Sequence, residues 1–124
     1  MSYSLDVLID LAKRKQNLEN QGDDWQAETY LQGIQSEIEE VEEELHGEQV
    51  VYLEDELGDV LWDYISLLVK LDSDNRITLE QVLTQVEEKY QERVSGLENQ
   101  IPWDEIKNDQ KTRLKARQAR EYNK

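Results

Sequence analysis

Four acidic residues in the middle of the chain have the types and the spacing of a metal site. Glu37 and Glu40 are three residues apart, and so are Glu56 and Asp59. Residues three apart lie on one face of an α-helix, so each pair directs two carboxylates the same way. If the two helices pack side by side, the pairs face each other. The pattern predicts a cation site with these four residues as the ligands.

Repulsion among the four carboxylates limits what such a site can do. Two carboxylates about 5 Å apart repel each other by roughly 3 kcal/mol at an effective dielectric constant of about 20. Such groups therefore take up protons or bind cations. The chain has no Cys and a single His, so oxygen ligands select Mg²⁺, or Mn²⁺, before Zn²⁺. A di-iron site is excluded, because it needs two Glu-x-x-His motifs and only Glu43-x-x-His46 is present.

The other acidic residues have a simpler explanation. Glu39 and Glu43 point away from the apolar residues of their helix, and we assign them, together with Glu42, to a solvated face. Glu56 and Asp59 differ, because they interrupt an otherwise apolar segment. A solvated face explains them poorly.

The elements that position these acids are predicted to be helices. The segments are 4–19, 25–46, 50–71, one from Thr78 to Ser95–Gly96, and one from Pro102 onward. Their short connections favour antiparallel neighbours. We therefore expect an all-α antiparallel helical bundle of about four to five helices, forming a single domain over residues 1–124.

Apolar spacing indicates which helix faces are buried. The segment 25–46 has one apolar stripe that is expected to face the core, formed by Leu31, Ile34, Ile38, Val41 and Leu45. The segment 50–71 is apolar on most faces, and one thin bundle cannot bury all of this apolar surface. We therefore expect a homo-oligomer. Gly58, between two of the acids, is expected to allow close approach of a neighbouring backbone.

Composition narrows the classes of partner. The formal net charge is −15. Residues 105–124 carry seven Lys or Arg against three acids, so the rest of the chain is strongly acidic and nucleic-acid binding is not expected. The basic tail either offsets this acidic body or binds an anion. The chain shows no signal peptide and no apolar run long enough to span a membrane, which favours a cytoplasmic location.

The two acidic motifs carry a family resemblance. Glu37-Ile-Glu-Glu40 followed by Glu56-Leu-Gly-Asp59 resembles the ExxE…ExxD signature of the MazG-like all-α nucleotide pyrophosphohydrolases. Trp25 precedes the first motif, as a Trp often does in that family. Ser36 and Asp55 depart from the usual Glu at their positions, which affects the expected substrate more than the metal site.

The resemblance implies an enzyme that uses Mg²⁺, with Mn²⁺ as a substitute, to hydrolyse nucleoside triphosphates. The products are pyrophosphate and a nucleoside monophosphate, and the role is house-cleaning of nucleotide pools. Glu37 or Glu40 is expected to activate the attacking water. Dimers or tetramers are typical of the family.

The resemblance also implies a set of substrate-binding residues. Lys89 and Arg93 lie one turn apart and are expected to bind the phosphates, together with Lys107, whereas Trp103 stacks on a base or anchors the last helix. Related activities, those of dUTPases and phosphoribosyl-ATP pyrophosphatases, remain alternatives. So does a non-catalytic, metal-binding helical interaction module.

Overall fold

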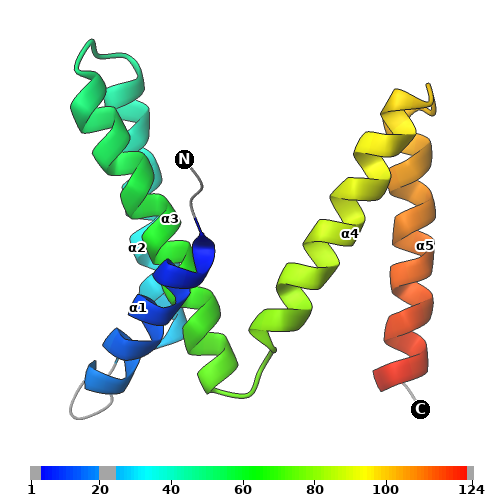
Figure 1. Ribbon diagram of the computed structural model, residues 1–124, viewed down its shortest axis with the longest axis horizontal. Helices are drawn as coiled ribbons and strands as arrows, with labels where there is room; N and C mark the ends of the chain where they lie inside the picture. The colour runs from blue at the N-terminus through cyan, green and yellow to red at the C-terminus, as the bar shows by residue number, and fades with distance from the viewer. Residues whose placement is uncertain (1–3, 20–24, 123–124) are drawn as a thin grey trace. The chain divides into compact units, whose positions relative to one another are not determined.

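The computed structural model describes residues 4–19 and 25–122. Within them the chain forms five α-helices and no strand (Figure 1), which are α1 Leu5–Glu19, α2 Ala27–Leu45, α3 Val50–Ser73, α4 Leu79–Glu98 and α5 Trp103–Tyr122. The predicted all-α helical fold is confirmed. In this part of the chain no helix has the length and apolar character needed to cross a membrane.

The chain divides into two compact units, residues 1–79 and 80–124. The first contains α1, α2 and α3, and the second contains nearly all of α4 and the whole of α5. Residues 1–79 include 20 acids and five Lys or Arg, whereas residues 80–124 include nine of each. The whole net charge of the protein therefore belongs to the first unit.

In the first unit α3 is the central helix, packed against both α1 and α2. Ala12 of α1 meets Ile65 and Val69 of α3 in a small core, with Trp62 partly buried beside them. The short connection 46–49 makes α2 and α3 antiparallel neighbours (Figure 1). This pairing brings the two acidic motifs onto facing helices.

The apolar stripe of α2 is directed differently from the prediction. Leu31, Ile38 and Leu45 are 48%, 52% and 62% exposed, although each was expected in the core. Gly33 lies on the side of α2 that meets α3, because a Cβ added there would lie 3.4 Å from Asp63 Oδ2. Three of the five stripe residues are thus exposed, whereas Ile34 and Val41 are partly buried.

The second unit is a hairpin in which α4 and α5 run antiparallel (Figure 1). The prediction that α4 ends at Ser95–Gly96 is wrong, because the helix continues to Glu98. A Cβ at Gly96 would lie 2.2 Å from Ile106 Cδ1 of α5, so this glycine serves the helix contact. Gln100, with φ 64°, reverses the chain, and the Ile101 N–H donates to the Gly96 carbonyl at 2.9 Å.

Candidate functional site

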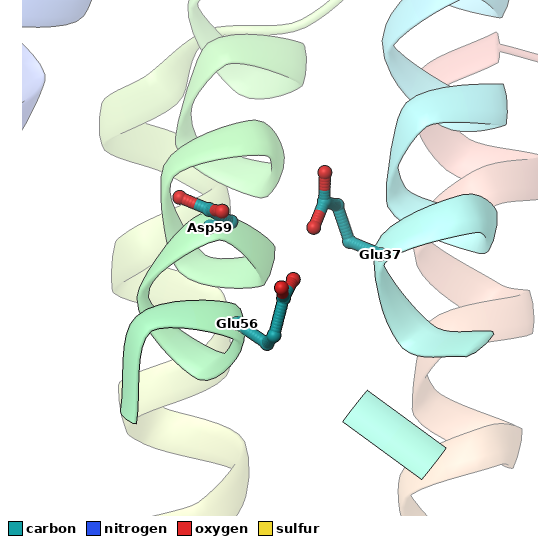
Figure 2. Close-up of side chains that lie close together, drawn as sticks. All are labelled: Glu37, Glu56 and Asp59. Atoms are coloured by element: carbon teal, nitrogen blue, oxygen red, sulfur yellow. The ribbon is translucent and has the colours of Figure 1, made fainter. Parts of the chain in front are cut away.

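Three of the four predicted ligands come together between α2 and α3. Glu37 of α2 faces Glu56 and Asp59 of α3 (Figure 2). One carboxylate oxygen from each of the three lies within 4.8 Å of the other two. The pairing of two antiparallel helices, each with acids three residues apart, produces this arrangement.

Two oxygen atoms of this cluster are buried without a partner. Glu37 Oε2 and Glu56 Oε2 are inaccessible to solvent and accept no hydrogen bond from the described residues. Leaving a buried carboxylate oxygen unsatisfied is unfavourable. The two atoms therefore fit a ligand that supplies positive charge, either a proton or a cation.

The pKa values show how the cluster behaves without a cation. Burial, hydrogen bonding to Glu40 and Glu56, and the charges of Glu40 and Asp59 raise the pKa of Glu37 from 4.5 to about 7. The pKa of Glu56 is also raised, first by hydrogen bonding to Glu40 and then by burial. With a pKa of about 7, Glu37 is partly protonated at neutral pH when no cation is bound.

Glu40, the fourth predicted ligand, lies at the edge of the cluster. Its side chain is exposed, and it does not belong to the group within 4.8 Å. It is nevertheless near enough to raise the pKa of both Glu37 and Glu56. The structure thus places a compact trio and an adjacent fourth carboxylate, an all-oxygen donor set that suits a hard divalent cation.

Asp63 was not among the predicted site residues, although it continues the same face of α3. Its carboxylate lies beside Gly33, and its pKa is raised by burial and by Asp59 but lowered by Lys15. Lys15 also lies 5.3 Å from the ring centroid of Trp25. The spacing of four residues between Asp59 and Asp63 is the sequence signal that could have identified Asp63. Because Lys15 belongs to α1, a cation from that helix borders the acidic cluster.

Gly58 does not have the role expected from the sequence. A Cβ added there would meet no atom within 4 Å. The residue faces open space, because the contact between α2 and α3 lies on the other side of the helix, where Glu56 and Asp59 point. The predicted close backbone approach at Gly58 is therefore wrong.

The basic residues predicted to bind substrate gather in the second unit. Lys89 and Arg93 of α4 and Lys107 of α5 line a pocket of about 410 Å³ between the two helices. Trp103, at the start of α5, lies with its ring centroid 5.1 Å from the Arg93 guanidinium and 6.5 Å from Tyr90. All four predicted residues thus belong to one hairpin.

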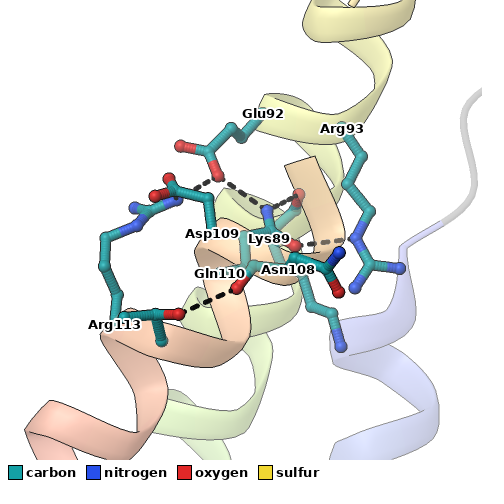
Figure 3. Close-up of polar contacts among 8 residues, drawn as sticks. Lys89, Glu92, Arg93, Asn108, Asp109, Gln110 and Arg113 are labelled. Carbon is teal, nitrogen blue, oxygen red and sulfur yellow. Dashed lines mark hydrogen bonds and ion pairs between the residues drawn. The ribbon is translucent and has the colours of Figure 1, made fainter. Parts of the chain in front are cut away.

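Arg93 is the most unusual residue of this pocket. Only 7% of it is exposed, and its Nε donates a hydrogen bond of 2.7 Å to Gln110 Oε1 (Figure 3). Gln110 was not predicted as a site residue, because a glutamine on a polar helix has no distinctive spacing. The pocket therefore contains a buried cation held by a neutral side chain.

A comparison with protein families identifies the chain. The model of the MazG nucleotide pyrophosphohydrolase domain matches residues 26–96, more than half of the sequence. The chain belongs to the MazG family. The MazG match covers α2, α3 and most of α4, including both acidic motifs together with Lys89 and Arg93.

Membership of the MazG family indicates a hydrolase of the nucleotide pyrophosphohydrolase type. The match ends before α5, so Trp103 and Lys107 lie outside it. Neither the curated proteins nor the solved structures contain a significant match to the chain. No relative therefore indicates the particular substrate or metal.

Proposed function

We propose that this MazG protein is a Mg²⁺-dependent nucleoside triphosphate pyrophosphohydrolase that releases pyrophosphate and a nucleoside monophosphate. The observation that carries the proposal is the cluster of Glu37, Glu56 and Asp59 on facing helices, with two buried carboxylate oxygens that lack a partner. Removal of surplus nucleotides from the pool is the proposed biological role.

Glu37, Glu40, Glu56 and Asp59 are the proposed ligands, with Mn²⁺ able to replace Mg²⁺. When bound, the cation neutralises negative charge on the acids and on the phosphate oxygens. Glu37 or Glu40 orients the attacking water and accepts its proton. Of the two, Glu40 lies at the edge of the cluster with an exposed side chain. Asp63 stays outside the ligand set, next to Lys15.

Lys89, Arg93 and Lys107 are proposed to bind the phosphate groups. Their support is that they line one pocket and form no ion pair with a carboxylate of the described chain. Trp103 is proposed to contact the substrate with the part of its ring that remains exposed, 36% of the residue. Its other contacts, with Arg93 and Tyr90, anchor it in the hairpin.

A homodimer or homotetramer is proposed as the active assembly, because apolar residues of α3 are uncovered. Leu57, Leu61 and Tyr64 are 50%, 43% and 47% exposed. A charge at such a position opposes burial in an interface. Leu61→Glu is therefore expected to lower the mass measured by light scattering, whereas Leu18→Glu on α1 should not. An unchanged mass of the Leu61→Glu variant would show that this face of α3 does not form the subunit interface.

The proposal is tested with a panel of nucleoside triphosphates, in which phosphate and pyrophosphate are quantified separately in the presence of Mg²⁺ or Mn²⁺. Pyrophosphate is expected as the first product, at a rate that collapses in EDTA. Inclusion of dUTP and phosphoribosyl-ATP separates the related activities. Orthophosphate as the first product contradicts the proposed reaction. Absence of any turnover favours a non-catalytic, metal-binding interaction module.

A further inference from the structure

Asp63 continues the acidic face of α3 beyond the three clustered carboxylates. It follows Asp59 by four residues, so the two side chains lie one turn apart on the same face of the helix. Its carboxylate reaches the contact between α2 and α3, because a Cβ added at Gly33 would lie 3.4 Å from Asp63 Oδ2. One or two carboxylates and several waters are enough to bind Mg²⁺. Asp59 and Asp63 could therefore share a second cation, next to the one proposed for the cluster.

The structure nevertheless treats Asp63 differently from the cluster. The carboxylate oxygens that lie within 4.8 Å of one another belong to Glu37, Glu56 and Asp59, and Asp63 is not a member of that group. Among the described residues, the buried carboxylate oxygens without a partner belong to Glu37 and Glu56. The unsatisfied oxygens that fit a cation are thus gathered at one place, and Asp63 lies beside it.

Helix α1 supplies a positive charge close to Asp63. Lys15 follows Ala12 by three residues, and Ala12 packs in the core against α3, so Lys15 lies on the side of α1 that meets α3. Burial and the charge of Asp59 raise the pKa of Asp63, whereas the charge of Lys15 lowers it. The ammonium group of Lys15 thus partly offsets the negative charges of Asp59 and Asp63.

Two aromatic rings hold this ammonium group in place. Lys15 Nζ lies 5.3 Å from the ring centroid of Trp25 and 5.9 Å from that of Tyr30. The two rings lie 5.2 Å apart, and Tyr30 is only 4% exposed. An ammonium group at these distances from an aromatic ring is attracted to it. The cation of α1 therefore has a defined position, set by residues at the start of α2.

We infer that Lys15 takes the part of a second metal ion, so that the site between α2 and α3 binds a single divalent cation. Lys15 acts through Asp63 and is therefore a positioning residue. It neutralises that carboxylate and repels any further cation that approaches it. The inference rests on the proposed function, from which it takes the metal site. It adds a residue of α1, which precedes the family match at residues 26–96.

The test counts the Mn²⁺ ions bound to the full chain without nucleotide. Electron paramagnetic resonance measures the free ion, and about 0.1 M KCl screens general attraction to the acidic surface. Wild type is expected to bind one Mn²⁺. Lys15→Met keeps the aliphatic stem over the rings but removes the charge, so Asp59 and Asp63 should then share a second ion and the count should rise to two. Adding Asp63→Asn to Lys15→Met should return the count to one.

Two control variants show whether the position of the charge matters. Lys13→Met removes the same charge from an exposed position of α1 and should leave the count at one. Lys15→Arg keeps the charge and should also leave it at one. A count of two in either control overturns the inference, because the second ion would then not depend on the charge of Lys15. Circular dichroism checks each fold, and Lys15→Gln replaces Lys15→Met if that variant unfolds.

The same counts separate this inference from the proposed function. Two ions on wild type, or one ion on both wild type and Lys15→Met, reject the role of Lys15 and leave the metal site standing. Absence of bound Mn²⁺ from both proteins rejects the metal site itself, and both proposals fall. Thermal melts give a second readout, because each bound ion stabilises the folded state. Excess Mn²⁺ should raise the Tm of Lys15→Met more than that of wild type, and an equal rise contradicts the inference.

Discussion

At the scale of single residues, the carboxylate cluster brings together acids that repel one another when no cation is bound. Glu37, Glu56 and Asp59 are held together by the packing of α2 on α3, and two of their oxygens lack partners. Packing thus imposes a repulsion that a bound cation relieves. The stability of the protein should therefore report on the site directly, even when activity is not measured.

Asp59→Asn is expected to leave the protein at least as stable as wild type in EDTA, because it removes one repelling charge and keeps the shape of the side chain. With saturating Mg²⁺ the order should reverse, since the wild-type site gains the free energy of ligand binding. Thermal melts in both buffers measure this. Asp55→Asn, an exposed acid on the same helix, is the control. An equal Mg²⁺ shift in wild type and Asp59→Asn would falsify the metal site.

The raised pKa of Glu37 predicts a pH dependence with a definite sign. Between 4.5 and about 7 the folded metal-free protein holds a proton that the unfolded chain has lost. In EDTA, the contribution of Glu37 to the free energy of unfolding is therefore complete below pH 4.5 and is lost as the pH rises toward 7. Mg²⁺ must displace the same proton, so its apparent affinity should rise about tenfold per pH unit up to 7 and then level off.

Mg²⁺ titrations at several pH values, read by calorimetry, check this dependence. Glu37→Gln serves as the comparison, because it cannot exchange the proton, and its weaker Mg²⁺ affinity should vary less with pH. A flat profile for wild type between pH 5 and 7 would show that no proton is displaced.

At the scale of the helices, Gly96 and Gly58 form a natural pair for comparison. Gly96→Ala would push a Cβ into Ile106 Cδ1 and should destabilise the hairpin by about 1–3 kcal/mol, less the helical preference of alanine. Gly58→Ala meets no atom and should gain up to about 1 kcal/mol. Denaturant titrations measure both. Ile106→Val in the Gly96→Ala background should recover part of the loss, and failure to do so would place the strain elsewhere.

The same two glycines show what the sequence predicts and what it does not. Helix positions follow from apolar spacing and turn residues, which are local properties, and all five helices were found. The role of a glycine depends on its neighbours in space. A terminus was predicted at Gly96 and a close contact at Gly58, whereas the close contact is at Gly96.

The candidate site was predictable to a similar extent. The positions of Glu37 on α2 and of Glu56 and Asp59 on α3 determine which side of each helix carries the acids. Once the two helices pack against each other, these three carboxylates must come together. The positions of Lys15 and Gln110 do not follow, because they reach the acids and Arg93 from other helices. Tertiary contacts of that kind leave no regular spacing in the sequence.

At the scale of the whole molecule, residues 1–124 remain predicted to be one domain. The family match runs from residue 26 to residue 96 and so includes parts of both compact units. Trp103 is the sole tryptophan of residues 80–124. If the chain unfolds cooperatively in urea, the fluorescence of Trp103 and the circular dichroism of all the helices should change together.

The variant Trp25→Phe with Trp62→Phe isolates the Trp103 signal, and Trp103→Phe isolates the signals of the first unit. Coincident fluorescence and circular dichroism transitions within each variant support one domain. Two separated transitions, with Trp103 reporting only one of them, would show that the hairpin unfolds independently and that the single-domain prediction is wrong.

The uneven division of charge also governs the ion atmosphere of the protein. Residues 1–79 carry the entire charge of −15, and a surface potential of about one thermal unit concentrates a divalent cation roughly sevenfold but a monovalent one less than threefold. Mg²⁺ is thus enriched around α2 and α3 before it meets any ligand. Since the Debye length falls to about 10 Å at 0.1 M salt, added KCl lowers the local concentration of Mg²⁺ around these helices. If the carboxylates bind Mg²⁺ as proposed, the affinity measured in dilute buffer also includes a contribution from the accumulated counterions.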